Sequence, residues 1–69
     1  MSMIIKWTNK YSNEQGYVRV IKKSLGHFEN TQDKKLARKF RTEKDAQRAV
    51  AVLEEIGESQ NNNFSFEEI

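Results

Sequence analysis

Residues 42–57, with the sequence TEKDAQRAVAVLEEIG, decide the fold that we expect for this chain. Thr42 is suited to cap a helix, and Asp45 three residues later resembles the acid of a capping box, although Asp is shorter than the usual Glu or Gln. Gly57 stands where a left-handed terminator belongs. One helical face collects the apolar residues Ala46, Ala49, Val50, Leu53 and Ile56. The stretch therefore predicts an amphipathic helix that packs one face against a sheet.

Three strands are predicted before this helix. Residues 3–8 follow the period of a half-buried strand, with Met3, Ile5 and Trp7 on one face and Ile4, Lys6 and Thr8 on the other. A turn-forming stretch, residues 9–16, leads into a second strand over residues 17–22. Residues 23–26 then make a short connection, with Gly26 available for a positive φ, to a third strand over residues 27–30. These strands form an antiparallel meander.

Two further elements complete the predicted fold. Asp33 is placed to cap a short first helix in which Leu36, Ala37 and Phe40 form one apolar stripe. After a polar spacer, residues 58–63, alternation around two phenylalanines predicts a last strand. We therefore expect a single α+β domain over residues 1–69. Its short helix and its amphipathic helix pack on one sheet face, and the C-terminal strand completes a four-stranded sheet.

Length and composition narrow the class of protein. A chain of 69 residues with 36% hydrophobic residues can bury one helix against one sheet. It leaves little apolar surface to enclose a deep substrate cavity. The chain has no Cys, so neither disulfides nor thiolate metal sites supplement the core. No apolar run approaches the ~20 residues that span a bilayer, and no signal-peptide core is present at the start. We expect a soluble cytoplasmic protein without a membrane partner.

No catalytic or metal-binding constellation is found in the sequence. The adjacent carboxylates Glu54 and Glu55 diverge on a helix, and Glu67 and Glu68 point to opposite faces of a strand. Neither pair can therefore flank one substrate bond. His27 is the single histidine and has no ligand three or four residues away. We therefore expect no enzyme activity, no metal site and no cofactor.

The charges are unevenly distributed along the chain. All twelve bases lie in residues 1–48, where five acids reduce the net charge to +7. The last 21 residues carry five acids and no base, a net charge of −5. Such asymmetry concerns association with charged partners and not the fold.

The sheet face away from the helix is a candidate docking surface. We expect the helix to cover Met3, Ile5, Trp7, Val18, Val20, Phe28, Phe64 and Phe66. The opposite face would then show Ile4, Lys6, Tyr17, Arg19, Ile21, His27, Glu29, Ser65 and Glu67. From this face we predict the partner-binding residues Lys6, Tyr17, Arg19, Ile21 and His27. The alternative is an ordinary solvated sheet face, on which scattered Ile and Tyr need no functional explanation.

A basic cluster is the second candidate surface. It consists of Lys34, Lys35, Arg38, Lys39, Arg41, Lys44 and Arg48. A run of charges is usually a solvated helix face. Here, however, Lys44 and Arg48 are like charges at i and i+4, which costs roughly 0.2–0.5 kcal/mol. Local helix stability therefore does not account for the cluster.

One segment resembles a known group of proteins. Ala37, Phe40, Thr42 and Ala46 follow the pattern A-x-x-F-x-T-x-x-x-A before the apolar helix face. This pattern is similar to a segment of very small sheet-plus-helix proteins encoded by phages and prophages. The resemblance covers about a quarter of the chain. It implies a gene product that binds host or phage macromolecules, in some cases to block a defence nuclease, and it assigns no functional residue.

Two functions compete on this evidence. The first is a non-enzymatic protein-interaction module, including a phage-type inhibitor of a host protein that handles nucleic acid or acts in defence. The second is a small nucleic-acid-binding protein, in which the basic cluster meets phosphates and Tyr17 stacks on a base. The C-terminal acids would repel a phosphate backbone, which favours the protein partner. Homodimer formation is left open.

Overall fold

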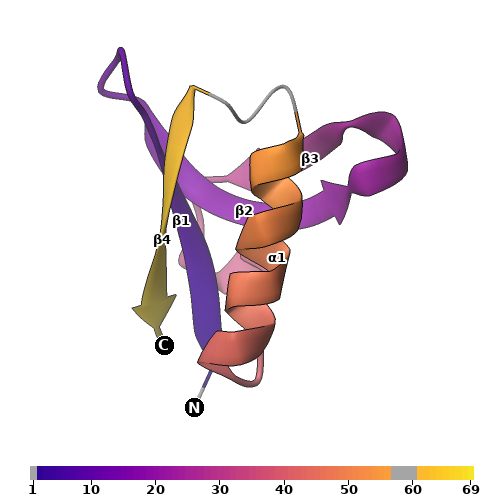
Figure 1. The fold of residues 1–69 in the computed structure, drawn as a ribbon. Coiled ribbons are helices and arrows are strands. Elements are labelled where there is room, and N and C mark those ends of the chain that lie inside the picture. The colour runs from indigo at the N-terminus through magenta and orange to yellow at the C-terminus, as the bar shows by residue number, and fades with distance from the viewer. Residues whose placement is uncertain (1, 57–60) are drawn as a thin grey trace.

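The computed structural model, which describes residues 2–56 and 61–69, contains one antiparallel sheet with a helix on one face (Figure 1). The strands are β1 (Met3–Asn9), β2 (Gln15–Lys22), β3 (His27–Thr31) and β4 (Asn62–Glu68), in the order β3-β2-β1-β4. The helix α1 spans Glu43–Glu55. The predicted α+β fold with a four-stranded sheet is confirmed.

The helix begins where its sequence predicted. The Thr42 side chain accepts a hydrogen bond from the backbone N–H of Asp45 at 3.2 Å, which satisfies one of the free donors of the first turn. The helix ends at Glu55, and Ile56 is its C-cap. The predicted terminator, Gly57, lies outside the described residues.

The main core forms between α1 and the sheet face that it covers. Its members are Ile5, Trp7, Val18, Phe28, Phe40, Ala46, Leu53 and Ile56. The partly buried side chains Met3, Ile21, Ala49, Val50, Phe64 and Phe66 pack against this cluster. Except for Ile21 and Phe40, these residues come from the sheet face and helix face that the sequence predicted to be apolar.

Strand β4 closes the sheet against the first strand of the chain. It pairs with β1 along its whole length, from Met3 opposite Glu68 to Asn9 opposite Asn62. Beyond the strands, the backbone of Ile69 donates to the carbonyl of Ser2 at 2.8 Å. The β1 strand is therefore central in the sheet.

A bulge in β2 reverses two predicted orientations. The register with β3 shifts between Val18 and Val20, so that Arg19 is an extra residue on the β2 side. Val20 then lies opposite Glu29, and Ile21 lies opposite the buried Phe28. Because the bulge shifts the alternation by one, Ile21 turns to the helix face and Val20 to the other face. The predictions for these two residues were wrong.

The predicted first helix is capped by Asp33 as expected, but it is only one turn long and does not carry the apolar stripe of Leu36, Ala37 and Phe40. This element, η2, is a 3-10 turn over Lys34–Leu36, and Oδ1 of Asp33 accepts from the backbone N–H of Lys35 at 2.9 Å. The residues that follow are extended, and their backbone groups bond to two strands. Such tertiary hydrogen bonds outweigh the helical spacing of Leu36, Ala37 and Phe40.

These extended residues, 37–40, form a crossing segment that passes between β1 and β2. The two strands pair with each other only at Lys6, Trp7 and Thr8 of β1. Where they separate, Arg38 N–H donates to the carbonyl of Val18 at 3.0 Å, and Phe40 exchanges two backbone bonds with Met3. Through this gap the chain leaves the face opposite the helix and reaches the helix face.

The route of the crossing segment explains a further wrong prediction. Ile4 was expected on an open face, but its side chain is fully buried. It lies on the same face as Tyr17 and Glu67, both of which Lys34 contacts as the η2 turn passes over them. Leu36, expected on a buried stripe, is 53% exposed instead. Both faces of β1 are therefore covered.

Candidate functional site

A groove with a volume of about 540 Å³ lies between one side of α1, the end of β2 and residues 38–41. We call it the basic groove. Its apolar floor consists of Ile21, Phe40, Ala49 and Val52, and its charged rim of Lys23, Arg38, Lys39, Arg41, Asp45 and Arg48. The groove therefore combines five cations with one carboxylate.

Local features of the fold place these side chains. The bulge at Arg19 turns Ile21 to the helix side, where it becomes part of the floor. Lys23 opens the 3-10 turn η1 (Lys23–Leu25), which closes on Gly26 in the left-handed conformation at φ 61°. The crossing segment contributes Arg38 and Phe40. The backbone of Arg38 is bonded to β2 and the backbone of Phe40 to β1, and these bonds hold both residues at the groove.

The cations of the basic groove are poorly neutralised. Among the described residues, only Arg48 of the five forms an ion pair, with Asp45 at 3.8 Å, and both side chains are largely exposed. The guanidinium of Arg38 lies over the Phe40 ring, 5.4 Å from its centroid. The Lys39 ammonium donates to the carbonyl of Lys35 at 3.3 Å. The groove therefore carries a surplus of positive charge that attracts anionic groups.

The structure divides the predicted basic cluster. Arg38, Lys39, Arg41 and Arg48 line the groove together. Lys35 and Lys44 are exposed outside its lining, and Lys34 lies on the opposite sheet face. Sequence reasoning missed Lys23, which lies directly after a strand and whose sequence position gives no sign that it joins the cluster.

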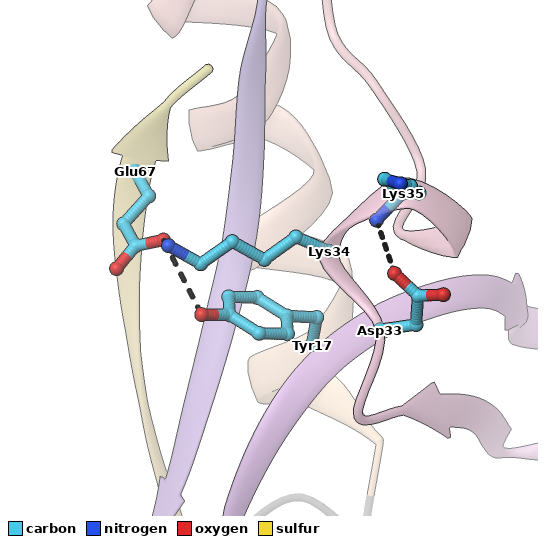
Figure 2. Close-up of polar contacts among 5 residues, drawn as sticks. All are labelled: Tyr17, Asp33, Lys34, Lys35 and Glu67. Carbon is cyan, nitrogen blue, oxygen red and sulfur yellow. Dashed lines mark hydrogen bonds and ion pairs between the residues drawn. The ribbon is translucent and has the colours of Figure 1, made fainter.

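Lys34 instead belongs to a polar cluster with Tyr17 and Glu67 (Figure 2). Its ammonium is 3.1 Å from Oε2 of Glu67 and 5.8 Å from the centre of the Tyr17 ring. The Tyr17 hydroxyl donates to the same carboxylate oxygen at 3.4 Å. The hydrogen bond and the attraction between the charges raise the pKa of Lys34 and lower the pKa of Glu67.

The structure removes one residue, Ile21, from the predicted partner-binding surface. Lys6 and Tyr17 are cross-strand neighbours on the face opposite the helix, and Arg19 is exposed at the bulge. His27 lies opposite Lys22 on the same face, next to the pair formed by Ile21 and Phe28. With Ile4 buried and Ile21 turned to the helix side, this face loses the two isoleucines that were expected to make it apolar.

Residues 2–56 and 61–69 contain neither a metal-binding cluster nor a membrane-spanning helix. No group of three His, Cys, Asp or Glu side chains among them could hold a metal ion. No helix in this part of the chain is long and apolar enough to cross a membrane. Comparisons with protein-family models, with curated proteins and with solved structures find no match for this chain.

Proposed function

We propose that this protein is a non-enzymatic interaction module whose basic groove binds an acidic segment of a partner protein. The observation that carries the proposal is the gathering of five cations, only one of them in an ion pair with a described residue, around an apolar floor. Holding five like charges together with a single carboxylate is unfavourable in the free protein. A partner that supplies carboxylates removes this repulsion and gains charge complementarity.

The apolar floor favours a protein segment over a nucleic acid. An acidic peptide that also carries a Leu or Phe can place this side chain between Ile21 and Val52 while its carboxylates meet the rim. Binding of a single strand depends on free aromatic faces. Here Arg38 covers the Phe40 ring and Lys34 lies over the Tyr17 ring. Nucleic acid is the second candidate, and the count of rim cations is the observation in its favour.

The resemblance of residues 37–53 to small phage proteins suggests the wider role of such a module. We propose that the acidic segment belongs to a host protein that handles nucleic acid, and that binding blocks or redirects this protein. Capture from the native host's lysate, with and without nuclease treatment, would identify the partner. A partner retained after nuclease treatment fits the proposal, whereas loss of all captured material would favour the nucleic-acid alternative.

The proposal can be tested with three fluorescent probes in an anisotropy titration. The first is an acidic peptide with one central Phe, the second is the same peptide with Ala in place of Phe, and the third is a single-stranded oligonucleotide. We expect the Phe peptide to bind about tenfold more tightly than the Ala peptide, because the floor buries an aromatic side chain. Tightest binding of the oligonucleotide at physiological salt would contradict the proposal.

Charge reversal locates the site. We expect Arg38→Glu with Arg41→Glu to weaken binding of the Phe peptide by about a hundredfold, since both change rim residues. The matched control is Lys10→Glu with Lys35→Glu, an equal change in net charge at exposed residues outside the groove lining. An equal loss in both double variants would mean that net charge alone governs binding, and the groove would then not be the site.

A further inference from the structure

A second pocket lies where β1 and β2 pair, at the end of the sheet away from the crossing segment. It has a volume of about 500 Å³ and shares no lining residue with the basic groove. It is lined by Trp7, Asn13, Glu14, Gln15, Asn30 and Gln32. We call it the indole pocket. Its lining contains four carboxamides, one carboxylate and one indole, and no cation.

The indole N–H of Trp7 has no acceptor among the described residues. The nitrogen is buried, and the whole side chain is only 8% exposed. Buried donors in native proteins are almost always paired, because an unpaired one costs roughly 1–3 kcal/mol. This donor belongs to a residue that lines a polar pocket, and a ligand atom can reach the buried nitrogen once the exposed Gln32 amide beside it moves.

Gly16 brings a second donor to the same place. A Cβ at this position would lie 2.9 Å from both Trp7 Nε1 and Gln32 Nε2, so only glycine leaves room for the two groups. Gln32 Nε2 donates to the carbonyl of Gln15 at 2.7 Å. Turning this amide over would offer its oxygen to the indole but leave the Gln15 carbonyl without its donor. In the arrangement described, the indole N–H is the donor left without an acceptor.

The lining selects the chemistry of a ligand. Carboxamides both donate and accept hydrogen bonds, and the Glu14 carboxylate accepts them and repels anions. A hydroxyl group can accept from the indole N–H and donate to a neighbouring oxygen at the same time. We propose that the indole pocket binds a neutral polyhydroxylated molecule, a saccharide, with one hydroxyl oxygen on Trp7 Nε1.

This site is independent of the basic groove and can be tested separately. Trp7 is the single tryptophan, so the protein has one indole N–H signal in a ¹H–¹⁵N NMR spectrum. The probes are maltotriose, cellobiose and chitobiose, with sodium sulfate as an anionic comparison. We expect at least one saccharide to shift the indole signal saturably, with a dissociation constant of roughly millimolar order for a shallow polar pocket.

Substitutions of two exposed pocket residues provide the second arm. Gln32→Ala and Asn30→Ala should each weaken binding of that saccharide about tenfold, since each removes a hydrogen-bonding amide. Gln47→Ala, an exposed amide on α1 that lines neither pocket, should leave the affinity unchanged.

Three results would overturn the proposal. They are an indole signal that no saccharide shifts at tens of millimolar, a shift with sulfate alone, or equal affinities in the pocket variants and in Gln47→Ala. The first would assign the indole N–H to bound water, and the second would make the ligand an anion.

Discussion

Ile4 and Ile5 are adjacent residues on opposite faces of one strand, and both are fully buried. A strand with one solvated face buries only alternate side chains. Here α1 covers the face of Ile5, while the η2 turn lies over the face of Ile4. The burial of Ile4 therefore shows that the second face of β1 is covered as well.

We predict that Ile4→Ala lowers the free energy of unfolding by about 2–5 kcal/mol, the range for deleting a buried aliphatic side chain. Urea denaturation followed by circular dichroism measures this change. Leu36→Ala is the control, because Leu36 is 53% exposed and should cost little. A larger loss for Leu36→Ala than for Ile4→Ala would restore the helical stripe that the sequence alone predicted.

The contact between Lys34 and Glu67 makes a contribution to stability that depends on pH. The ammonium lowers the pKa of Glu67, so the contact stabilises the fold at neutral pH and loses its effect as the pH falls through the lowered pKa. On the basic side, the pKa of Lys34 is raised, and the contribution is lost as the pH rises through it. The effect on stability is small because both side chains are partly exposed.

We predict that Lys34→Met raises the pKa of Glu67 towards the ordinary value of a glutamate. NMR titration of the side-chain carboxyl carbon gives this pKa directly. Lys35→Met is the matched control, since the Lys35 side chain makes no contact with Glu67 in the described structure. If both variants shifted the Glu67 pKa equally, a general charge effect and not the 3.1 Å contact would be responsible.

At the scale of elements, α1 holds the sheet through a small number of buried side chains. We predict that Leu53→Ala costs about 2–5 kcal/mol, a large share of the stability of so small a domain. Val52→Ala, on the partly exposed side that lines the basic groove, should cost less than about 1 kcal/mol. Thermal denaturation of both variants compares them, and similar losses would mean that the described helix register is wrong.

Because of the β2 bulge, we expect Ile21 to contribute more to stability than Val20, the opposite of what regular alternation along β2 would give. Ile21→Ala should destabilise by about 1–3 kcal/mol, because Ile21 packs against the core, whereas Val20→Ala should cost less than about 1 kcal/mol. Urea denaturation of the two variants measures the order. If Val20→Ala were the more harmful change, regular alternation through β2 would be restored and the bulge would be absent.

These elements show what the sequence can predict. The start of α1 depends on Thr42 and on helical spacing, which are local, and it was predicted correctly. The bulge at Arg19 and the extended Phe40 depend on backbone bonds to residues far away in the chain, which no local pattern encodes. For the same reason, the sequence predicted only part of the basic groove. Four of its cations were predicted as a cluster, but Lys23 and Ile21 join them only through the turn and the bulge.

For the whole molecule, the gathered charge predicts how binding depends on salt. A single strand that neutralises the five groove cations should lose roughly a hundredfold in affinity between about 50 and 200 mM salt. The Phe peptide should lose less than about tenfold, because apolar contact with the floor is not screened and a peptide releases no condensed counterions. Anisotropy titrations across this range measure both slopes, and an equally steep slope for the peptide would contradict a role for the floor.

The central position of β1 has a consequence for folding during synthesis on the ribosome. Met3 is paired on one side by Phe40 and on the other by Glu68, both of which the ribosome adds later. During synthesis the apolar run Met3–Ile4–Ile5 therefore emerges without the neighbours that later cover it. An unpaired, apolar strand is prone to pair with other chains. We expect nascent chains that stall before residue 61 to require a chaperone, whereas chains that include β4 can close the sheet and fold unaided.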